Sequence, residues 1–144
     1  MNPIIDLFEE ELSKDLRTKS HYHGDVIRNI FIVSGFVMLF TLPVFKDLVS
    51  VPFYVSSLII IFLGLFAGLT NPFKKWVIGL NVLVSAVGVI VFEYYAVNQY
   101  FLINEDERVK WFFIVNMGLA IAFFIAFYYG TRTFKAMFLP KDKE

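Results

Sequence analysis

The sequence predicts an all-α integral membrane protein, a four-helix bundle with an N-terminal cytoplasmic amphipathic helix. Its 144 residues are 58% hydrophobic and only 18% charged, with a mean hydropathy of +0.65, whereas soluble domains are about 45–50% apolar and about 25% charged. Four stretches without a charged residue approach the roughly 20 residues that a bilayer-spanning helix needs. These stretches are apolar throughout, which favours helices over the alternating pattern of barrel strands.

The chain divides into three parts. Residues 1–27 form the amphipathic helix and a linker, residues 28–133 the transmembrane bundle, and residues 134–144 a cytoplasmic tail. Asn2 and Pro3 suit a helix start, since Asn caps helices well and proline fits the first turn. Apolar residues then recur at helical spacing, namely Ile4, Ile5, Phe8, Leu12 and Leu16.

The charge of this first helix is unusual for a lipid-bound segment. Up to Leu16 the helix contains one basic residue, Lys14, and five acidic residues (Asp6, Glu9, Glu10, Glu11, Asp15). Helices at membrane surfaces usually carry Lys and Arg instead. We therefore expect the helix to dock on the basic cytoplasmic face of the bundle, near Lys74 and Lys75. The alternative is contact with a neighbouring subunit or a partner protein.

A short linker with two histidines follows. His21, His23 and Asp25 alternate along the chain, but alternate residues converge on a metal only in an extended segment. The two histidines are weak metal ligand candidates, and we expect a linker with two titrating imidazoles and no metal site.

The four spans are predicted near residues 28–46, 51–71, 73–98 and 105–133. Asn71 and Pro72 predict the start of the third span, as Asn2 and Pro3 do for the first helix. Asn104 is the expected cap of the fourth, with Glu105, Asp106 and Glu107 in its first turn, where acids complement the helix dipole. Capping explains these acids; the alternative is an outer vestibule that gathers cations.

The distribution of basic residues predicts the orientation in the membrane. With four spans, ten Lys and Arg lie on the side of the termini and three on the other. Cytoplasmic flanks are enriched in these residues. We therefore expect a multi-pass protein of the cell (inner) membrane with both termini in the cytoplasm.

Small residues predict where the helices touch, because close backbone approach drives helix association in lipid. Gly64 and Gly68 form a GxxxG pattern in the second span. The fourth span carries the longer stripe of Gly118, Ala122, Ala126 and Gly130. Both stripes suit packing inside one bundle or at a subunit interface, and the longer stripe is the better interface candidate.

Polar residues within the spans are the candidates for function, since they are costly in hydrocarbon. Glu93 has apolar sequence on both sides, Asn116 lies at a similar depth in the fourth span, and Asn81 lies one turn inside Trp76. They form a candidate ion or proton pathway. The structural alternative is a snorkelling or paired carboxylate and two interhelical hydrogen bonds.

Composition and motifs exclude several classes of function. Equal numbers of basic and acidic residues, 13 of each, argue against a nucleic-acid ligand. With no cysteine and no enzyme motif, we expect no enzyme activity and no cofactor. The favoured interpretation is a homo-oligomeric channel or transporter for a small cation or proton. The alternative is a non-transporting membrane bundle that binds or regulates a partner protein.

Overall fold

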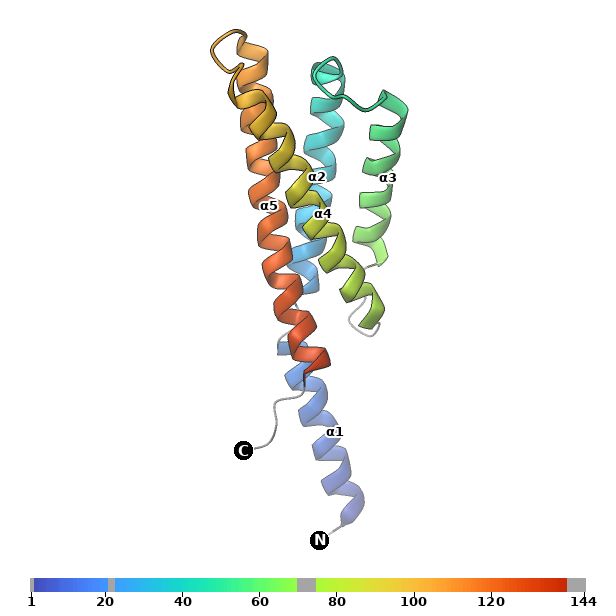
Figure 1. Ribbon diagram of the computed structural model, residues 1–144. Helices are drawn as coiled ribbons and strands as arrows, with labels where there is room; N and C mark the ends of the chain where they lie inside the picture. The colour runs from blue at the N-terminus through green and yellow to red at the C-terminus, as the bar shows by residue number, and fades with distance from the viewer. Residues whose placement is uncertain (1, 21–22, 70–74, 140–144) are drawn as a thin grey trace.

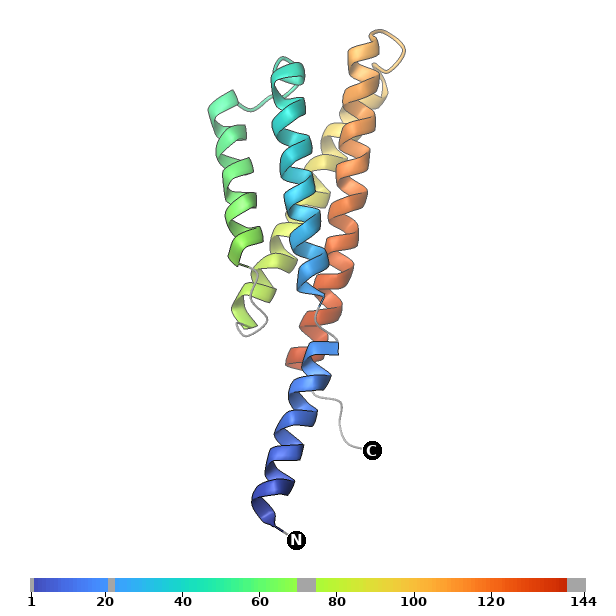
Figure 2. The same cartoon turned by 180° about the vertical axis from the view of Figure 1, so that it is seen from behind.

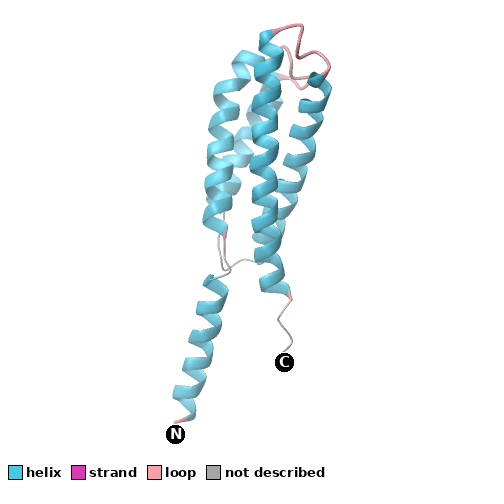
Figure 3. Ribbon diagram, turned by 90° about the vertical axis from the view of Figure 1, so that its left-hand side faces the viewer, coloured by secondary structure: helices cyan, strands magenta, loops and turns pink. Residues whose placement is uncertain are grey.

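The computed structural model describes residues 2–20, 23–69 and 75–139, which fold into helices joined by short connections (Figures 1 and 3). Within those ranges it contains five helices and no strand. The helices are α1 (Pro3–Ser20), α2 (Gly24–Phe45), α3 (Phe53–Leu69), α4 (Lys75–Tyr100) and α5 (Glu107–Phe138).

Three of these helices are long and apolar enough to cross a membrane. They are α2, α4 and α5. Helix α3 is also apolar, but it has 17 residues and is shorter than the other three. The sequence therefore encodes a helical chain compatible with a membrane protein, by the length and composition of its helices.

Helices α2 to α5 lie side by side, and α1 projects beyond them (Figures 1 and 2). We call the end where α5 begins the Arg108 end and the opposite end, near the start of α2, the Thr133 end. Helix α4 packs along α5, and α2 contacts both α3 and α5. Over the described residues α3 and α4 make little contact with each other.

The core lies where α2, α4 and α5 meet around the ring of Phe123. This ring stacks on Phe31 of α2, with centroids 5.6 Å apart, and lies 5.2 Å from the ring of Phe92 of α4. Gly88 makes this possible, because a Cβ there would overlap the Phe123 ring. On the other side of the core, Leu63 and Ala67 of α3 are buried in the same cluster. Aromatic packing into a glycine notch thus fixes α4 against α5.

Helix α1 does not dock on the other helices through the side chains that the structure describes. All side chains from Asn2 to Lys14 are exposed, and in Figures 1 and 2 the helix points away from the rest of the molecule. The expected docking near Lys75 is therefore absent, and Lys74 lies outside the described residues. Glu10 accepts a hydrogen bond from Lys14 at 2.8 Å, and this contact raises the pKa of Lys14.

The helix caps follow the predicted chemistry with one shift. Asn2 Oδ1 accepts a hydrogen bond from the Ile4 N–H at 3.2 Å, which confirms the first cap. The fourth-span cap is Asp106 instead of Asn104: its backbone is extended and its Oδ1 accepts from the Arg108 N–H at 2.9 Å. Residues 101–105 form a turn, which delays the helix to Glu107. Asn71 and Pro72 lie outside the described residues.

Candidate functional site

A cavity of about 710 Å³ lies between α3 and α4, with walls also from α2 and α5. It exists because α3 packs on α2 while α4 packs on α5, so that the two outer helices leave a space between them. Helix α2 contributes Met38 and Leu42, and α5 contributes Phe112, Asn116 and Phe123. The remaining lining residues are Val49, Val51, Ser56, Ile59, Ile60, Leu63, Leu83, Val84, Val87, Gly88, Ile90, Val91, Phe92, Tyr94 and Tyr95.

The cavity opens sideways between the two outer helices. Its floor is formed by buried residues such as Leu63 and Phe123, which are 5% and 2% exposed. Its rim is formed by exposed residues of both outer helices, including Ile59 of α3 and Val87 and Ile90 of α4. The open side of the cavity therefore lies along the length of these two helices.

The chemistry of the lining is almost wholly apolar. Among the described residues, no charged residue lines the cavity, and the polar side chains in its lining are Ser56, Asn116, Tyr94 and Tyr95. The amide of Asn116 is already engaged, since Nδ2 donates to the Phe112 carbonyl of its own helix at 2.8 Å. Ordered water needs two to four polar partners. Such a lining suits an apolar occupant much better than water or a hydrated ion.

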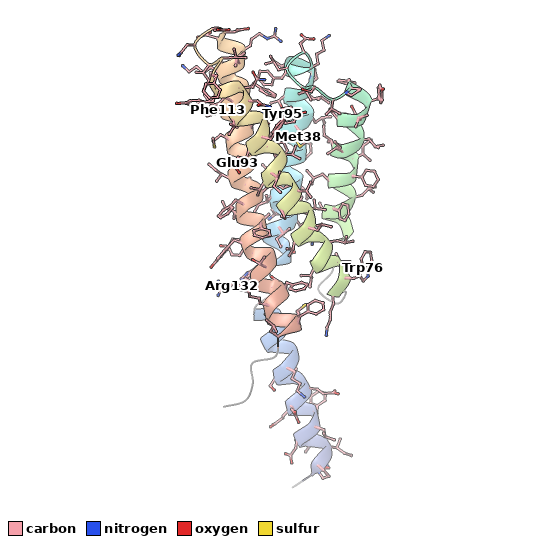
Figure 4. All side chains as sticks on the ribbon, in the orientation of Figure 1. Met38, Trp76, Glu93, Tyr95, Phe113 and Arg132 are labelled. Atoms are coloured by element: carbon pink, nitrogen blue, oxygen red, sulfur yellow. The ribbon has the colours of Figure 1, made fainter. Side chains whose placement is uncertain are left out.

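The three candidate pathway residues do not share this space. Asn116 lines the cavity, whereas Glu93 does not. The Glu93 side chain is exposed and lies on the face of α4 turned away from α3, while Met38 and Tyr95 line the cavity (Figure 4). Asn81 is buried at 1% exposure, and its Oδ1 has no hydrogen-bond partner among the described residues. The structure therefore brings Glu93 and Asn116 to the same end of the molecule without pairing them.

The acidic turn at the Arg108 end has a local structural role. Glu105, Asp106 and Glu107 are exposed and do not line the cavity. Asp106 caps α5, and Arg108 Nη2 donates to the Val44 carbonyl at 2.9 Å and lies 3.7 Å from Asp47 Oδ2. Through Arg108, the start of α5 is thus held to the end of α2.

The small residues fall into two groups. Gly130 and Ala126 are buried, and a Cβ at Gly130 would lie 3.0 Å from Val82 Cγ2 of α4. Gly118, Gly64 and Gly68 are exposed, and a Cβ at each would have no neighbour within 4 Å. Ala122 is half-buried. Only one half of the α5 stripe therefore packs within the chain, and the outer half is open.

His23 anchors the start of α2 to α5. Its backbone N–H donates to Thr133 Oγ1 at 3.3 Å, and its ring lies edge-on to Tyr129 at 5.0 Å. His21 lies outside the described residues. Among the residues that are described, no group of three His, Cys, Asp or Glu side chains is arranged to hold a metal ion.

Comparison of the chain with protein-family models, with curated proteins and with solved structures finds no match. The cavity is therefore the feature of the molecule that best indicates a function. Sequence patterns did not indicate it, because its lining residues are ordinary span residues until the helices are placed. The one available signal was Gly88, a small residue between large ones in the third predicted span.

Proposed function

We propose that this chain is a non-transporting four-helix membrane bundle that binds a hydrocarbon chain in the cavity between α3 and α4. The ligand class is a lipid acyl chain or another long apolar chain dissolved in the bilayer. The observation that carries the proposal is the cavity itself: about 710 Å³, without a charged lining residue, and open to the side. Small-molecule sites are typically about 300–1,000 Å³ and mostly apolar.

The proposal treats α3 as the fourth span. Its 17 residues rise about 25 Å, which is at the short end of the range for a bilayer core about 30 Å thick. The excess of Lys and Arg in the sequence on the side of the termini supports a cytoplasmic location for the Thr133 end and an outside location for the Arg108 end.

This placement explains why a hydrocarbon chain fits the site. The rim lies along the spans, so that it faces acyl chains and not water. Tyr94 and Tyr95 line the cavity toward the Arg108 end, and tyrosine favours the membrane interface, where its hydroxyl is hydrated and its ring is not. A chain in the cavity therefore keeps its polar head near the outer interface.

The competing hypothesis is a homo-oligomeric pathway for a small cation or proton through Glu93, Asn116 and Asn81. A pathway needs polar groups in one continuous space. Glu93 lies outside the cavity that Asn116 lines, and this separation supports the binding interpretation instead. Flux through liposomes that contain the chain, lost in Glu93→Gln, would overturn the proposal.

The proposal is tested by photolabelling in phosphatidylcholine vesicles. The probes are a fatty acid with a diazirine in its chain and a phosphatidylcholine that carries the same chain, so that the two arms separate a free lipophile from a phospholipid. We expect labelled peptides from residues 56–63 and 83–95, which contain the lining of the two outer helices.

Two tryptophan variants provide the matched comparison. Ile60→Trp places a large side chain in the cavity, whereas Ile61 is the same residue type on the same helix, is 60% exposed and does not line the cavity. We expect Ile60→Trp to lower labelling of the lining peptides several-fold and Ile61→Trp to leave it unchanged. Equal labelling in both variants would show that the probe samples the lipid-facing surface at random.

A further inference from the structure

Helix α1 carries an apolar stripe that nothing in the described chain covers. Ile4, Ile5, Phe8 and Leu12 are 72%, 56%, 66% and 48% exposed. At 100° per residue these four positions occupy one side of the helix, and α1 stands apart from the other helices (Figures 1 to 3). An exposed apolar stripe on a helix indicates a binding surface.

The borders of this stripe are acidic. On the helical wheel Glu9 flanks one edge and Glu11 the other, with the exposed Leu7 beyond Glu11. The anionic headgroups of a cytoplasmic leaflet repel such a helix. The surface that covers the stripe must therefore combine apolar groups with positive charge.

A surface of this kind lies at the Thr133 end of the other helices. The rings of Phe134 and Phe138 stack with centroids 4.3 Å apart and remain 38% and 44% exposed. Lys75 Nζ lies 5.7 Å from the centroid of the Phe138 ring, and Lys135 is exposed about one helical turn before Phe138 on α5. We call Lys75, Phe134, Lys135 and Phe138 the basic-aromatic patch.

The patch also lies at the correct depth for contact with a cytoplasmic helix. The charge-free part of α5 from Trp111 to Thr131 already rises about 30 Å, the thickness of the bilayer core. Phe134 and Phe138 follow this segment and therefore lie at or beyond the cytoplasmic interface. The Phe134 ring lies against α4, because a Cβ at Gly79 would be in ordinary van der Waals contact with it at 3.8 Å.

Within one chain the stripe does not contact its own patch. The start of α2 is held to α5 by the His23 N–H and Thr133 Oγ1 at 3.3 Å, and α1 points away from α4 and α5 (Figures 1 and 2). We propose that α1 of one copy docks its apolar stripe on the basic-aromatic patch of a second copy. The reciprocal contact fills both patches, which gives a closed two-fold dimer by exchange of α1.

The complementary charges distinguish this proposal from simple hydrophobic association. Glu9 and Glu11 border the stripe, and Lys75 and Lys135 border the aromatic rings of the patch. Opposite charges around an apolar contact set partner choice and register more than affinity. The dimer should therefore respond to charge reversal on either side and recover when both sides are reversed.

The test uses disulfide crosslinking, which is clean because the chain has no cysteine. Two differently tagged copies, one with Phe8→Cys and one with Phe138→Cys, are coexpressed and oxidised in membranes. We expect a disulfide-linked product that carries both tags. Ser13→Cys in place of Phe8→Cys is the matched control, because Ser13 lies on the opposite side of α1; it should give a several-fold lower yield.

Charge reversal provides the second arm. Glu9→Lys on the first copy or Lys135→Glu on the second should each lower the yield several-fold, and the two together should restore it. A disulfide that forms only within a single chain bearing both cysteines would overturn the proposal in favour of self-docking. Equal yields from Phe8→Cys and Ser13→Cys would overturn it in favour of random encounter.

A further measurement needs no cysteine variants and leaves the basic-aromatic patch unchanged. Phe8→Asp changes an exposed residue of α1, so that the remaining helices keep their packing. We expect it to halve the protein mass of the particle in mild detergent, whereas Ser13→Asp leaves the mass unchanged. A parent particle of one chain, or a two-chain particle that persists in Phe8→Asp, would contradict an α1-exchanged dimer.

Discussion

At the scale of single residues, Gly88 and Phe123 decide how α4 packs on α5. The Phe123 ring occupies the space that a Cβ of Gly88 would need and contacts Phe31 and Phe92 as well. Because the same ring forms part of the cavity floor, its position sets both the core and the candidate site. Glu93, which the sequence indicated as a candidate for an ion or proton pathway, has no comparable role in the core.

We expect Gly88→Ala to destabilise the protein by about 1–3 kcal/mol, because an added methyl group overpacks the Phe123 contact. This loss exceeds the gain in helix propensity, which is at most about 1 kcal/mol. Thermal unfolding in detergent measures it. Gly64→Ala is the control, since a Cβ there has no neighbour within 4 Å. The double variant Gly88→Ala/Phe123→Leu should recover part of the stability; equal melting of Gly88→Ala and the parent would disprove the notch.

At the scale of helices, the stripe of small residues on α5 acts in two halves. Toward the Thr133 end Ala126 and Gly130 are buried against neighbouring helices, with Val82 of α4 close to Gly130. Toward the Arg108 end Gly118 has open space. The spacing of small residues in the sequence cannot distinguish these halves. The path of α4 along α5 decides which half is covered, and this path depends on both helices.

The two glycines at the ends of the stripe should therefore respond differently to the same substitution. Gly130→Leu should lower the melting temperature strongly, since the side chain would separate α5 from α4 and α2. Gly118→Leu should leave thermal stability unchanged. Detergent-solubilised protein serves for both measurements. Should Gly118→Leu instead lower the particle mass at constant stability, the open half would be a subunit interface.

At the scale of the whole molecule, the important features are the distribution of charge between the two ends and the uneven packing of the helices. The described basic residues Lys75, Arg132 and Lys135 lie at the Thr133 end, together with Trp76 (Figure 4). The two outer helices α3 and α4 leave a cavity open to the side. In the proposed arrangement, the molecule binds its ligand from within the membrane and its partner copy from the cytoplasm.

The proposed orientation predicts a labelling pattern in intact cells. A membrane-impermeant thiol reagent should modify Ser50→Cys and Asn104→Cys, which lie in the connections at the Arg108 end, and should not modify Ser13→Cys in α1. The reason is the excess of basic residues on the side of the termini. Permeabilised cells give the control, because all three variants should then react. The reverse pattern in intact cells would show an inverted protein.

The sequence by itself determined the helical class and the approximate bounds of the helices. These properties follow from local composition: apolar runs of about 20 residues and capping residues such as Asn2. The start of α5 shifted by two residues because Asn104 and Asp106 both suit a cap, and only the turn before Asp106 decides between them.

Tertiary structure alone decided which faces meet. Leu63 and Ile61 are equally apolar in the sequence, yet Leu63 is 5% exposed and lines the cavity while Ile61 is 60% exposed. Gly118 and Gly130 are likewise one pattern in sequence and two environments in space. The physical reason is that the free energy of an apolar side chain is almost the same against other protein side chains as against lipid hydrocarbon. Hydropathy therefore places a residue in the span, and only the packing of neighbouring helices assigns it to core, cavity or lipid.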